Sequence, residues 1–328
     1  MSAGVREHRV RRFTLRDGHV LQDVVQAYTL LGELNAARDN LVVIFHSLTS
    51  PPDPREWWAE AVGAGRPIDT DRYAVLTTNL LGSCYGTTPL PAGATVTPRD
   101  MAALVKLLVD ELGVSRVALA TGGSLGGMVT LEWVASFPEL TRAAVVFAAP
   151  AAHTAQAIGY NHVQREAIRL GGEAGLELAR MIGMLTYRTP AELEQRFGRA
   201  RRADGVFEVQ SYLAHQGEKL RRRFSVSSYL ALMDAMDAHD VGAGRGGVGP
   251  ALRAFRGRLV GVGIRGDQLY PPEQVRAWVD AAGARYREID TVHGHDAFLL
   301  EAEQVGAIVG EALERLAVRR RRQRPASV

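Results

Sequence analysis

Residues 121–128 read Thr-Gly-Gly-Ser-Leu-Gly-Gly-Met and place Ser124 at the centre of a Gly-x-Ser-x-Gly pattern. The apolar, β-rich residues 116–120 precede this stretch, and a helical pattern follows it. A serine on a sharp turn between a buried strand and a helix presents its hydroxyl at the edge of the sheet. Gly122 and Gly126 leave room that side chains would block. The stretch therefore predicts a nucleophile elbow, with the N-terminus of a helix close to any oxyanion formed at the serine.

The rest of the chain alternates between apolar strands and helices. Strand patterns that are apolar at every position, such as 41–45, indicate strands that are buried on both faces. Strands of this kind separated by helices predict an α/β fold, with a mostly parallel central sheet and helices on both faces. The predicted strands are 12–15, 24–29, 41–45, 73–78, 116–120, 143–148, 258–264 and 285–289. The predicted helices are 101–112, 129–135, 273–282 and 298–318.

The alternation stops between residues 151 and 255. This segment is helical, is rich in Arg and Glu, and contains no convincing strand. We therefore predict a first part of the core at residues 1–150, a helical cap inserted at 151–255, and a second part of the core at 256–318. The cap is expected to lie over the strand ends where Ser124 emerges. The last ten residues, 319–328, predict a basic, disordered tail.

A serine hydroxyl becomes a nucleophile when a neighbouring base removes its proton. Asp267 follows the predicted strand 258–264, and His295 follows the predicted strand 285–289. A serine, an acid and a histidine, each placed after a separate strand, occur in this chain order in the α/β hydrolases. The sequence therefore predicts Ser124 as the nucleophile, His295 as the base, and Asp267 as the carboxylate that orients the imidazole.

The oxyanion formed during acyl transfer needs two hydrogen-bond donors. One is expected to be the backbone N–H of Leu125, the residue after the nucleophile. The other should come from residues 46–52, the loop that follows the strand 41–45. Within that loop we choose the N–H of Leu48, although the sequence does not separate it from its two neighbours in the chain.

Three other patterns suggest different chemistry. Residues 242–247 fit a Gly-x-Gly-x-x-Gly fingerprint, but the residues before them are helical and polar, whereas dinucleotide binding needs a strand there. His293 and His295 with Asp296 resemble a metal site, but no further clustered ligand accompanies them, so we expect no metal. Cys84 has no histidine partner of its own and is expected to pack near the site.

Composition limits the partners and the compartment. Five of the arginines fall in the last ten residues, and without them the net charge of +3 becomes −2. A slightly acidic body is a poor match to a phosphate backbone, so we expect no nucleic-acid partner. The sequence has no apolar run long enough for a membrane span and no signal-peptide core. With a single cysteine, these features predict a cytoplasmic protein without a membrane partner.

Beyond the triad, the chain resembles the homoserine O-acetyltransferase family, a branch of the α/β hydrolases. The elbow of that family reads Gly-Gly-Ser-Met-Gly-Gly-Met, and residues 122–128 differ from it only at Leu125. The resemblance runs from Phe13 to Leu316 and extends into the cap, where general hydrolases share nothing. The other matching stretches are 79–88, 160–168, 211–213, 267–271 and 294–298.

The resemblance implies transfer of an acetyl group from acetyl-CoA to the hydroxyl of homoserine by a ping-pong route through acetyl-Ser124. Acetyl-CoA is then a co-substrate, and no tightly bound cofactor is expected. In the family, a cap arginine and a nearby tyrosine hold the substrate carboxylate, and the aspartate after the catalytic histidine holds the ammonium. The matching positions are Arg180, Tyr187 and Asp296. The family also implies a homodimer formed through the cap.

The chain departs from the family pattern in regions that shape the substrate pockets. The cap motif Arg-Phe-Asp-Ala-Asn-Ser-Tyr reads Arg-Phe-Ser-Val-Ser-Ser-Tyr at residues 223–229. The segments near 89–98 and 170–177 are shorter than is usual, and the loop 46–52 also differs. Four alternatives therefore stay open: a serine acceptor, a succinyl donor, an ester hydrolase with the same triad, and a catalytically silent binding protein on this fold.

Overall fold

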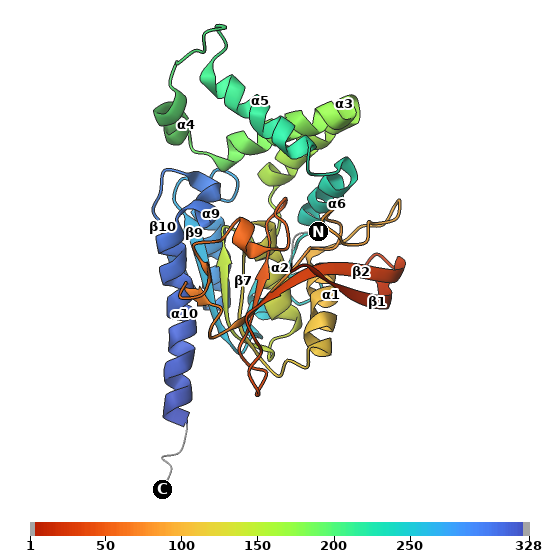
Figure 1. Ribbon diagram of the computed structural model, residues 1–328, viewed down its shortest axis with the longest axis vertical. Helices are drawn as coiled ribbons and strands as arrows, with labels where there is room; N and C mark the ends of the chain where they lie inside the picture. The colour runs from red at the N-terminus through yellow and green to blue at the C-terminus, as the bar shows by residue number, and fades with distance from the viewer. Residues whose placement is uncertain (1–3, 324–328) are drawn as a thin grey trace.

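An eight-stranded sheet lies at the centre of the computed structural model, which describes residues 4–323 (Figure 1). The strand order is β1-β2-β6-β3-β7-β8-β9-β10. The pairs β1–β2 and β2–β6 are antiparallel, and the pairs from β6 to β10 are parallel. The mostly parallel sheet that the sequence predicts is therefore confirmed.

The elements follow the predicted order closely. The strands of the sheet are β1 Arg6–Thr14, β2 Val20–Leu31, β3 Leu41–Phe45, β6 Ala74–Thr78, β7 Val117–Gly123, β8 Thr141–Phe147, β9 Arg258–Ile264 and β10 Arg285–Ile289. A separate pair is formed by β4 Val62–Gly63 and β5 Ile68–Asp69. The helices are α1 Pro98–Glu111, α2 Leu125–Ser136, α3 Ala155–Tyr187, α4 Pro190–Phe197, α5 Glu208–Arg221, α6 Val226–Asp237, α7 Val248–Arg253, α8 Pro272–Ala282, α9 Ala297–Leu300 and α10 Ala302–Gln323. Short 3-10 turns lie at Pro54–Glu56 and Gly294–Asp296.

The last helix differs from the prediction. The pattern 298–318 predicts one helix, but the backbone of Glu301 is non-helical and separates α9 from α10. The Glu301 carboxylate accepts a hydrogen bond from Thr291 Oγ1 at 2.5 Å, which ties the break to the loop after β10. Helix α10 also continues to Gln323, into the segment predicted as a tail, because arginine is a good helix former. The remainder of that predicted tail, 324–328, lies outside the described residues.

The sheet is buried on both faces because its strands are apolar at every position. In β3, Leu41, Val43 and Phe45 belong to the cluster that includes α1, α2 and α8. Val42 and Ile44, which point to the other face, belong to the cluster that includes α10. Both clusters are continuous hydrophobic cores, as expected for parallel strands between two helical layers. No helix in the described range combines the length and apolar character needed to cross a membrane.

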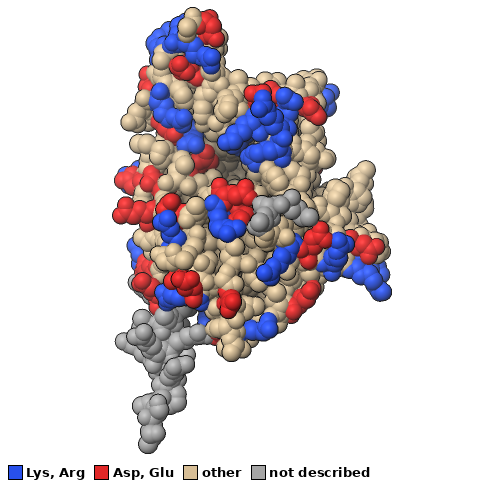
Figure 2. Space-filling view, in the orientation of Figure 1, with Lys and Arg blue, Asp and Glu red and all other residues tan. Residues whose placement is uncertain are grey.

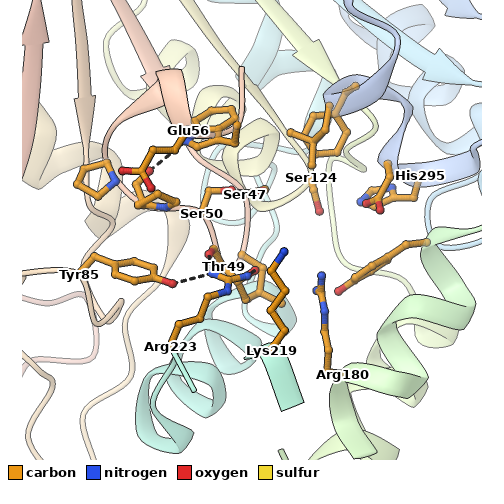
Figure 3. Close-up of a pocket in the computed structure, with 18 of the residues that line it drawn as sticks. Ser47, Thr49, Ser50, Glu56, Tyr85, Ser124, Arg180, Lys219, Arg223 and His295 are labelled. Carbon is orange, nitrogen blue, oxygen red and sulfur yellow. Dashed lines mark hydrogen bonds between the residues drawn. The ribbon is translucent and has the colours of Figure 1, made fainter. Parts of the chain in front are cut away.

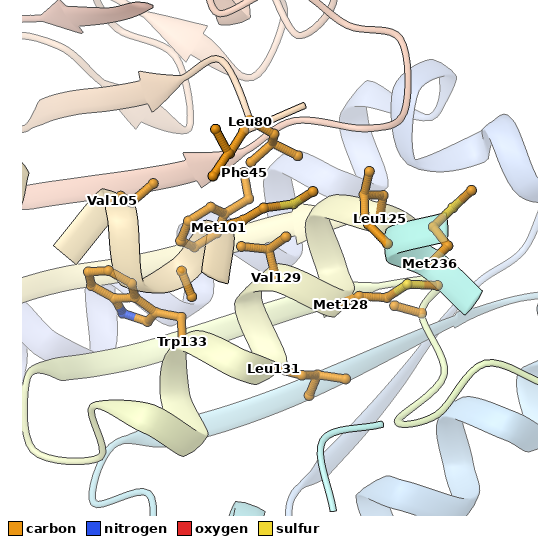
Figure 4. Packing of buried hydrophobic residues seen from close by; sticks show 14 of the residues in the cluster. Phe45, Leu80, Met101, Val105, Leu125, Met128, Val129, Leu131, Trp133 and Met236 are labelled. Carbon is orange, nitrogen blue, oxygen red and sulfur yellow. The ribbon is translucent and has the colours of Figure 1, made fainter. Parts of the chain in front are cut away.

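Helices α3 to α6 form the cap above the carboxyl ends of the strands, between β8 and β9 in the chain (Figure 1). Met236 of α6 belongs to the same hydrophobic cluster as Leu125 and Met128 of α2, which attaches the cap to the core (Figure 4). Helix α7, the last helix of the segment predicted as the cap, packs against α2 and α8. The residues 242–247 lie in turns between α6 and α7, with no strand before them.

Close backbone contacts at the elbow explain its glycines. A Cβ atom on Gly126 would lie 2.0 Å from the carbonyl oxygen of Phe45, and one on Gly122 would lie 2.5 Å from the carbonyl oxygen of Gly126. Both neighbours are backbone atoms of the sheet or of the helix start, so they cannot move aside as a side chain could. The predicted need for small residues at these two positions is therefore confirmed.

Replacement of this glycine tests how tightly the elbow is packed. Gly126→Ala is expected to lower the free energy of unfolding by about 3 kcal/mol or more, because the added methyl group overlaps the Phe45 backbone. Gly159→Ala is the matched control, since a Cβ there meets nothing within 4 Å and the position is exposed on α3. That control is expected to stabilise the fold by roughly 0.5 kcal/mol or more. Equal unfolding midpoints for the two variants in urea would contradict this account.

Candidate active site

Ser124 lies on a strained turn between β7 and α2. Its backbone has φ 57° and ψ −126°, a conformation that costs energy for any residue with a side chain. The turn is held by the Ser124 N–H, which donates to the Phe147 carbonyl at 3.0 Å, and by the Ser124 carbonyl, which accepts from the Met128 N–H at 3.0 Å. The side chain points into a cavity beneath the cap (Figure 3).

His295 and Asp267 form a buried hydrogen-bonded pair. His295 Nδ1 lies 2.7 Å from Asp267 Oδ2, and both side chains are almost fully buried. Asp267 Oδ1 accepts hydrogen bonds from the backbone N–H groups of Leu269 and Tyr270, each at 2.9 Å. Because both carboxylate oxygens accept hydrogen bonds, the carboxylate is fixed and the proton of His295 is placed on Nδ1.

The surroundings of His295 suit a base. Burial alone would lower its pKa, but the charge and hydrogen bond of Asp267, with the nearby Asp296 carboxylate, raise it above the ordinary histidine value. Nε2 is buried and has no hydrogen-bond partner within residues 4–323. His295 and Ser124 line the same cavity. The arrangement can take a proton from a hydroxyl placed between them.

The loop after β3 lies on the other side of Ser124. His46 anchors it: its Nδ1 donates to the Ser47 carbonyl at 2.7 Å, and its Nε2 accepts from the Leu80 N–H at 2.9 Å. Burial lowers the pKa of His46 to about 4, so the ring stays neutral and keeps this pattern. The N–H groups of Leu48 and Leu125 donate to no other group in the described part of the chain. Two backbone donors are thus left for an oxyanion at Ser124.

The cavity under the cap has a volume of about 810 Å³. Core loops and cap helices both contribute to its lining (Figure 3). Its polar lining residues are Ser47, Thr49, Ser50, Glu56, Tyr85, Ser124, Arg180, Tyr187, Lys219, Arg223, His295 and Asp296. The structure therefore brings Ser124, His295, Leu48 and the three residues matched to substrate binding into one cavity, with Asp267 and Leu125 directly behind it.

Arg180 and Tyr187 enter the cavity together from α3. The Arg180 guanidinium carbon lies 5.4 Å from the centroid of the Tyr187 ring, and that ring lies 5.6 Å from the His295 ring. Burial raises the pKa of Tyr187, although the charge of Arg180 opposes the shift. The tyrosine therefore stays a neutral donor beside a fixed cation.

Asp296 is not an isolated carboxylate. Arg188 Nη2 lies 3.0 Å from Asp296 Oδ2, and Arg188 Nη1 lies 3.0 Å from the buried carboxylate of Glu192. Sequence reasoning did not identify Arg188, although it directly follows Tyr187 at the end of α3. An ammonium group that approaches Asp296 would share it with this arginine.

Two further cap residues at the cavity were also missed as site residues. Arg223 donates from Nη1 to the Thr49 carbonyl and to the Tyr85 hydroxyl, both at 2.6 Å, and so ties the cap to the loop after β3. Lys219 lines the cavity and has no carboxylate partner in the described part of the chain. Figure 2 shows basic side chains gathered on this side of the cap. The signal in the sequence was the basic run at the end of α5.

The alternative sites do not assemble. Cys84 is half-buried, and burial raises the pKa of its thiol, which disfavours the reactive thiolate. Within residues 4–323 no group of three His, Cys, Asp or Glu side chains is placed to hold a metal ion.

Comparison with known proteins agrees with this geometry. The α/β hydrolase fold family matches residues 40–302. A homoserine O-acetyltransferase from Moorella thermoacetica is 41% identical over 350 residues, covering 92% of this chain and 93% of the relative. A homoserine O-acetyltransferase from Thermus thermophilus is 43% identical over 334 residues, covering 89% of this chain and 86% of the relative.

Solved structures give the same fold. A homoserine O-acetyltransferase from Staphylococcus aureus superposes with a TM-score of 0.83 at 29% identity, covering 94% of each chain. Esterase E22 superposes with a TM-score of 0.86 at 17% identity, covering 94% of this chain and 99% of the esterase, which is a likeness of fold alone. The fold matches, the full-length relatives and the assembled Ser124, His295 and Asp267 lead to one assignment: this chain belongs to the homoserine O-acetyltransferase family of α/β hydrolases.

Proposed function

We propose that the protein is an O-acyltransferase that moves an acetyl group from acetyl-CoA to the side-chain hydroxyl of L-homoserine. The observation that carries the proposal is the shared cavity, in which Ser124 and the His295–Asp267 pair face Arg180 and Tyr187 of the cap. The activities named for the relatives support the same reaction. No tightly bound cofactor is needed, because the donor carries the acetyl group.

In the first half-reaction His295 Nε2 takes the proton of Ser124 as the serine oxygen attacks the thioester carbonyl. The N–H groups of Leu48 and Leu125 stabilise the tetrahedral oxyanion. Its collapse breaks the C–S bond, and the departing CoA sulfur takes the proton from His295. An acetyl ester on Ser124 and free CoA remain. Asp267 keeps the imidazole in the tautomer that this proton transfer needs.

In the second half-reaction His295 deprotonates the acceptor hydroxyl, which attacks the acetyl ester and regenerates Ser124. We assign the acceptor carboxylate to Arg180 and Tyr187, because a planar guanidinium and a neutral phenol both donate hydrogen bonds to a carboxylate. We assign the acceptor ammonium to Asp296, which would hold it together with its existing partner Arg188.

Product release tests the activity. Purified enzyme with acetyl-CoA is expected to release CoA rapidly when homoserine is present and slowly with serine or without an acceptor. Ser124→Ala should abolish both the release and the acetyl adduct seen by mass spectrometry of the protein, because no other nucleophile replaces the serine. CoA release that is equal with and without any acceptor would instead support an ester hydrolase. A succinyl-CoA preference would keep the mechanism and change the donor.

The role of Arg180 is tested by separating the half-reactions. Arg180→Ala is expected to leave acetylation of Ser124 by acetyl-CoA within about twofold of the wild type. It should raise the KM for the acceptor by roughly 10- to 100-fold, because charge-assisted hydrogen bonds to the carboxylate are lost. Arg169→Ala, an exposed arginine on the same helix that pairs with Glu166, is the matched control. An unchanged acceptor KM in Arg180→Ala would remove this residue from the acceptor site.

The expected homodimer through the cap is also a proposal. Helix α3 carries large apolar side chains that are exposed in the single chain, namely Val163, Leu170, Leu178 and Leu185. Leu170→Asp with Leu178→Asp is expected to convert a dimer to a monomer in sedimentation velocity, because a charge buried in an interface is costly. Leu107→Asp, on α1 outside the cap, should leave the dimer intact. A wild-type protein that sediments as a monomer would overturn the proposal.

A further inference from the structure

A second buried Asp–His pair lies behind the catalytic one. His153 Nδ1 is 2.8 Å from Asp237 Oδ1, and the His153 side chain is 1% exposed. His153 lies in the segment that enters the cap after β8, and Asp237 is the last residue of α6. The acyl-transfer steps above use neither residue.

The partners of this pair define its protonation. Asp237 also accepts hydrogen bonds from Asn161 and Arg165 of α3. Burial alone would raise its pKa, but these bonds and the one from His153 lower it below the ordinary aspartate value. The carboxylate therefore stays ionised, and the His153 proton is placed on Nδ1. Nε2 of His153 is then an acceptor.

Tyr270 connects this pair to the triad. Its hydroxyl lies 3.0 Å from His153 Nε2, and it is fully buried. Burial raises its pKa well above the ordinary tyrosine value, so the hydroxyl stays a donor to His153. The backbone N–H of Tyr270 donates to Asp267 Oδ1, and its ring stands edge-on to the His295 ring with centroids 5.2 Å apart. One residue thus contacts both members of the catalytic pair.

We propose that His153 and Asp237 are positioning residues that hold Tyr270, and through it the Asp267 carboxylate and the His295 ring, in the reactive arrangement. The proposal rests on the proposed function only in taking Ser124 and His295 as the reacting groups. Asp237 and its partners on α3 belong to the cap, whereas Tyr270 belongs to the core. The geometry of the triad is therefore set partly from the cap.

Titration of His295 reports this positioning. The groups that face its ring are Asp267, Asp296, Tyr187 and Tyr270. Those that face the second pair are Tyr270, Arg165 and His239. Because Asp267 raises the pKa of His295, a carboxylate held less firmly raises it less. Loss of the Tyr270 anchor should therefore move the acidic limb of the rate profile to lower pH.

Tyr270→Phe is the sharpest test, because it removes one hydroxyl and keeps the ring beside His295. The reaction to follow is release of the phenol from an activated aryl acetate, which needs Ser124 and His295 but neither acetyl-CoA nor homoserine. We expect kcat to fall about 10-fold with little change in KM, since a buried acceptor on His153 is left unpaired. The acidic limb should move down by about half a pH unit or more.

Two further variants complete the experiment. Asp237→Asn should give the same direction of change, because the amide no longer specifies the His153 tautomer. Tyr286→Phe is the matched control: its hydroxyl bonds Glu288 at 2.7 Å on β10, and neither rate nor limb should change. The downfield imidazole proton signal of His295 should shift in Tyr270→Phe and stay in place in Tyr286→Phe.

The outcomes separate the two proposals. Slower aryl ester turnover in Tyr270→Phe with an unmoved acidic limb and an unmoved His295 proton signal would mean a purely structural role and would overturn the inference. Tyr270→Phe and Asp237→Asn that both behave like the wild type would also overturn it. A wild-type enzyme that turns over the aryl acetate but not acetyl-CoA with homoserine would refute only the proposed acceptor and donor, and the inference on His153 would stand on its own result.

Discussion

The contact between the start of α2 and the end of β3 is the constraint on which the site depends. Gly126 approaches the Phe45 carbonyl so closely that no side chain fits between them. This approach forces the backbone of Ser124 into its strained conformation and directs the helix N-terminus toward the serine. The same strand end starts the loop that carries Leu48. Both oxyanion donors are therefore placed by one backbone contact.

Much of this could be predicted from the sequence because the signals are local. The strands 41–45, 258–264 and 285–289 agree with the structure to the residue, since apolar runs between turns specify buried parallel strands. Ser124, Asp267 and His295 were identifiable because each follows such a strand, and carboxyl ends of parallel strands meet at one edge of the sheet. The break at Glu301 was missed because it depends on a side-chain bond to Thr291 in another element.

The rest of the site depends on pairings between distant segments. Arg188 neutralises Asp296 across more than one hundred residues of chain, and nothing in the periodicity of either segment indicates it. His153 and Tyr270 are 117 positions apart, and Asp237 comes from a third element. Interactions of this kind follow from where the cap lies on the core, and residue patterns do not encode that placement.

The cap and the sheet share one hydrophobic cluster, in which Met236 and Leu232 lie with Leu125 and Met128. Lifting the cap as a rigid lid would expose these side chains to water, and the cost grows with the apolar area uncovered. Reactants therefore reach Ser124 through the mouth of the cavity rather than under a raised lid. A long, thin donor such as a thioester on a flexible arm can thread such a passage, whereas a broad one cannot. Selection of the acyl donor thus begins with the width of an entrance, before any polar group is recognised.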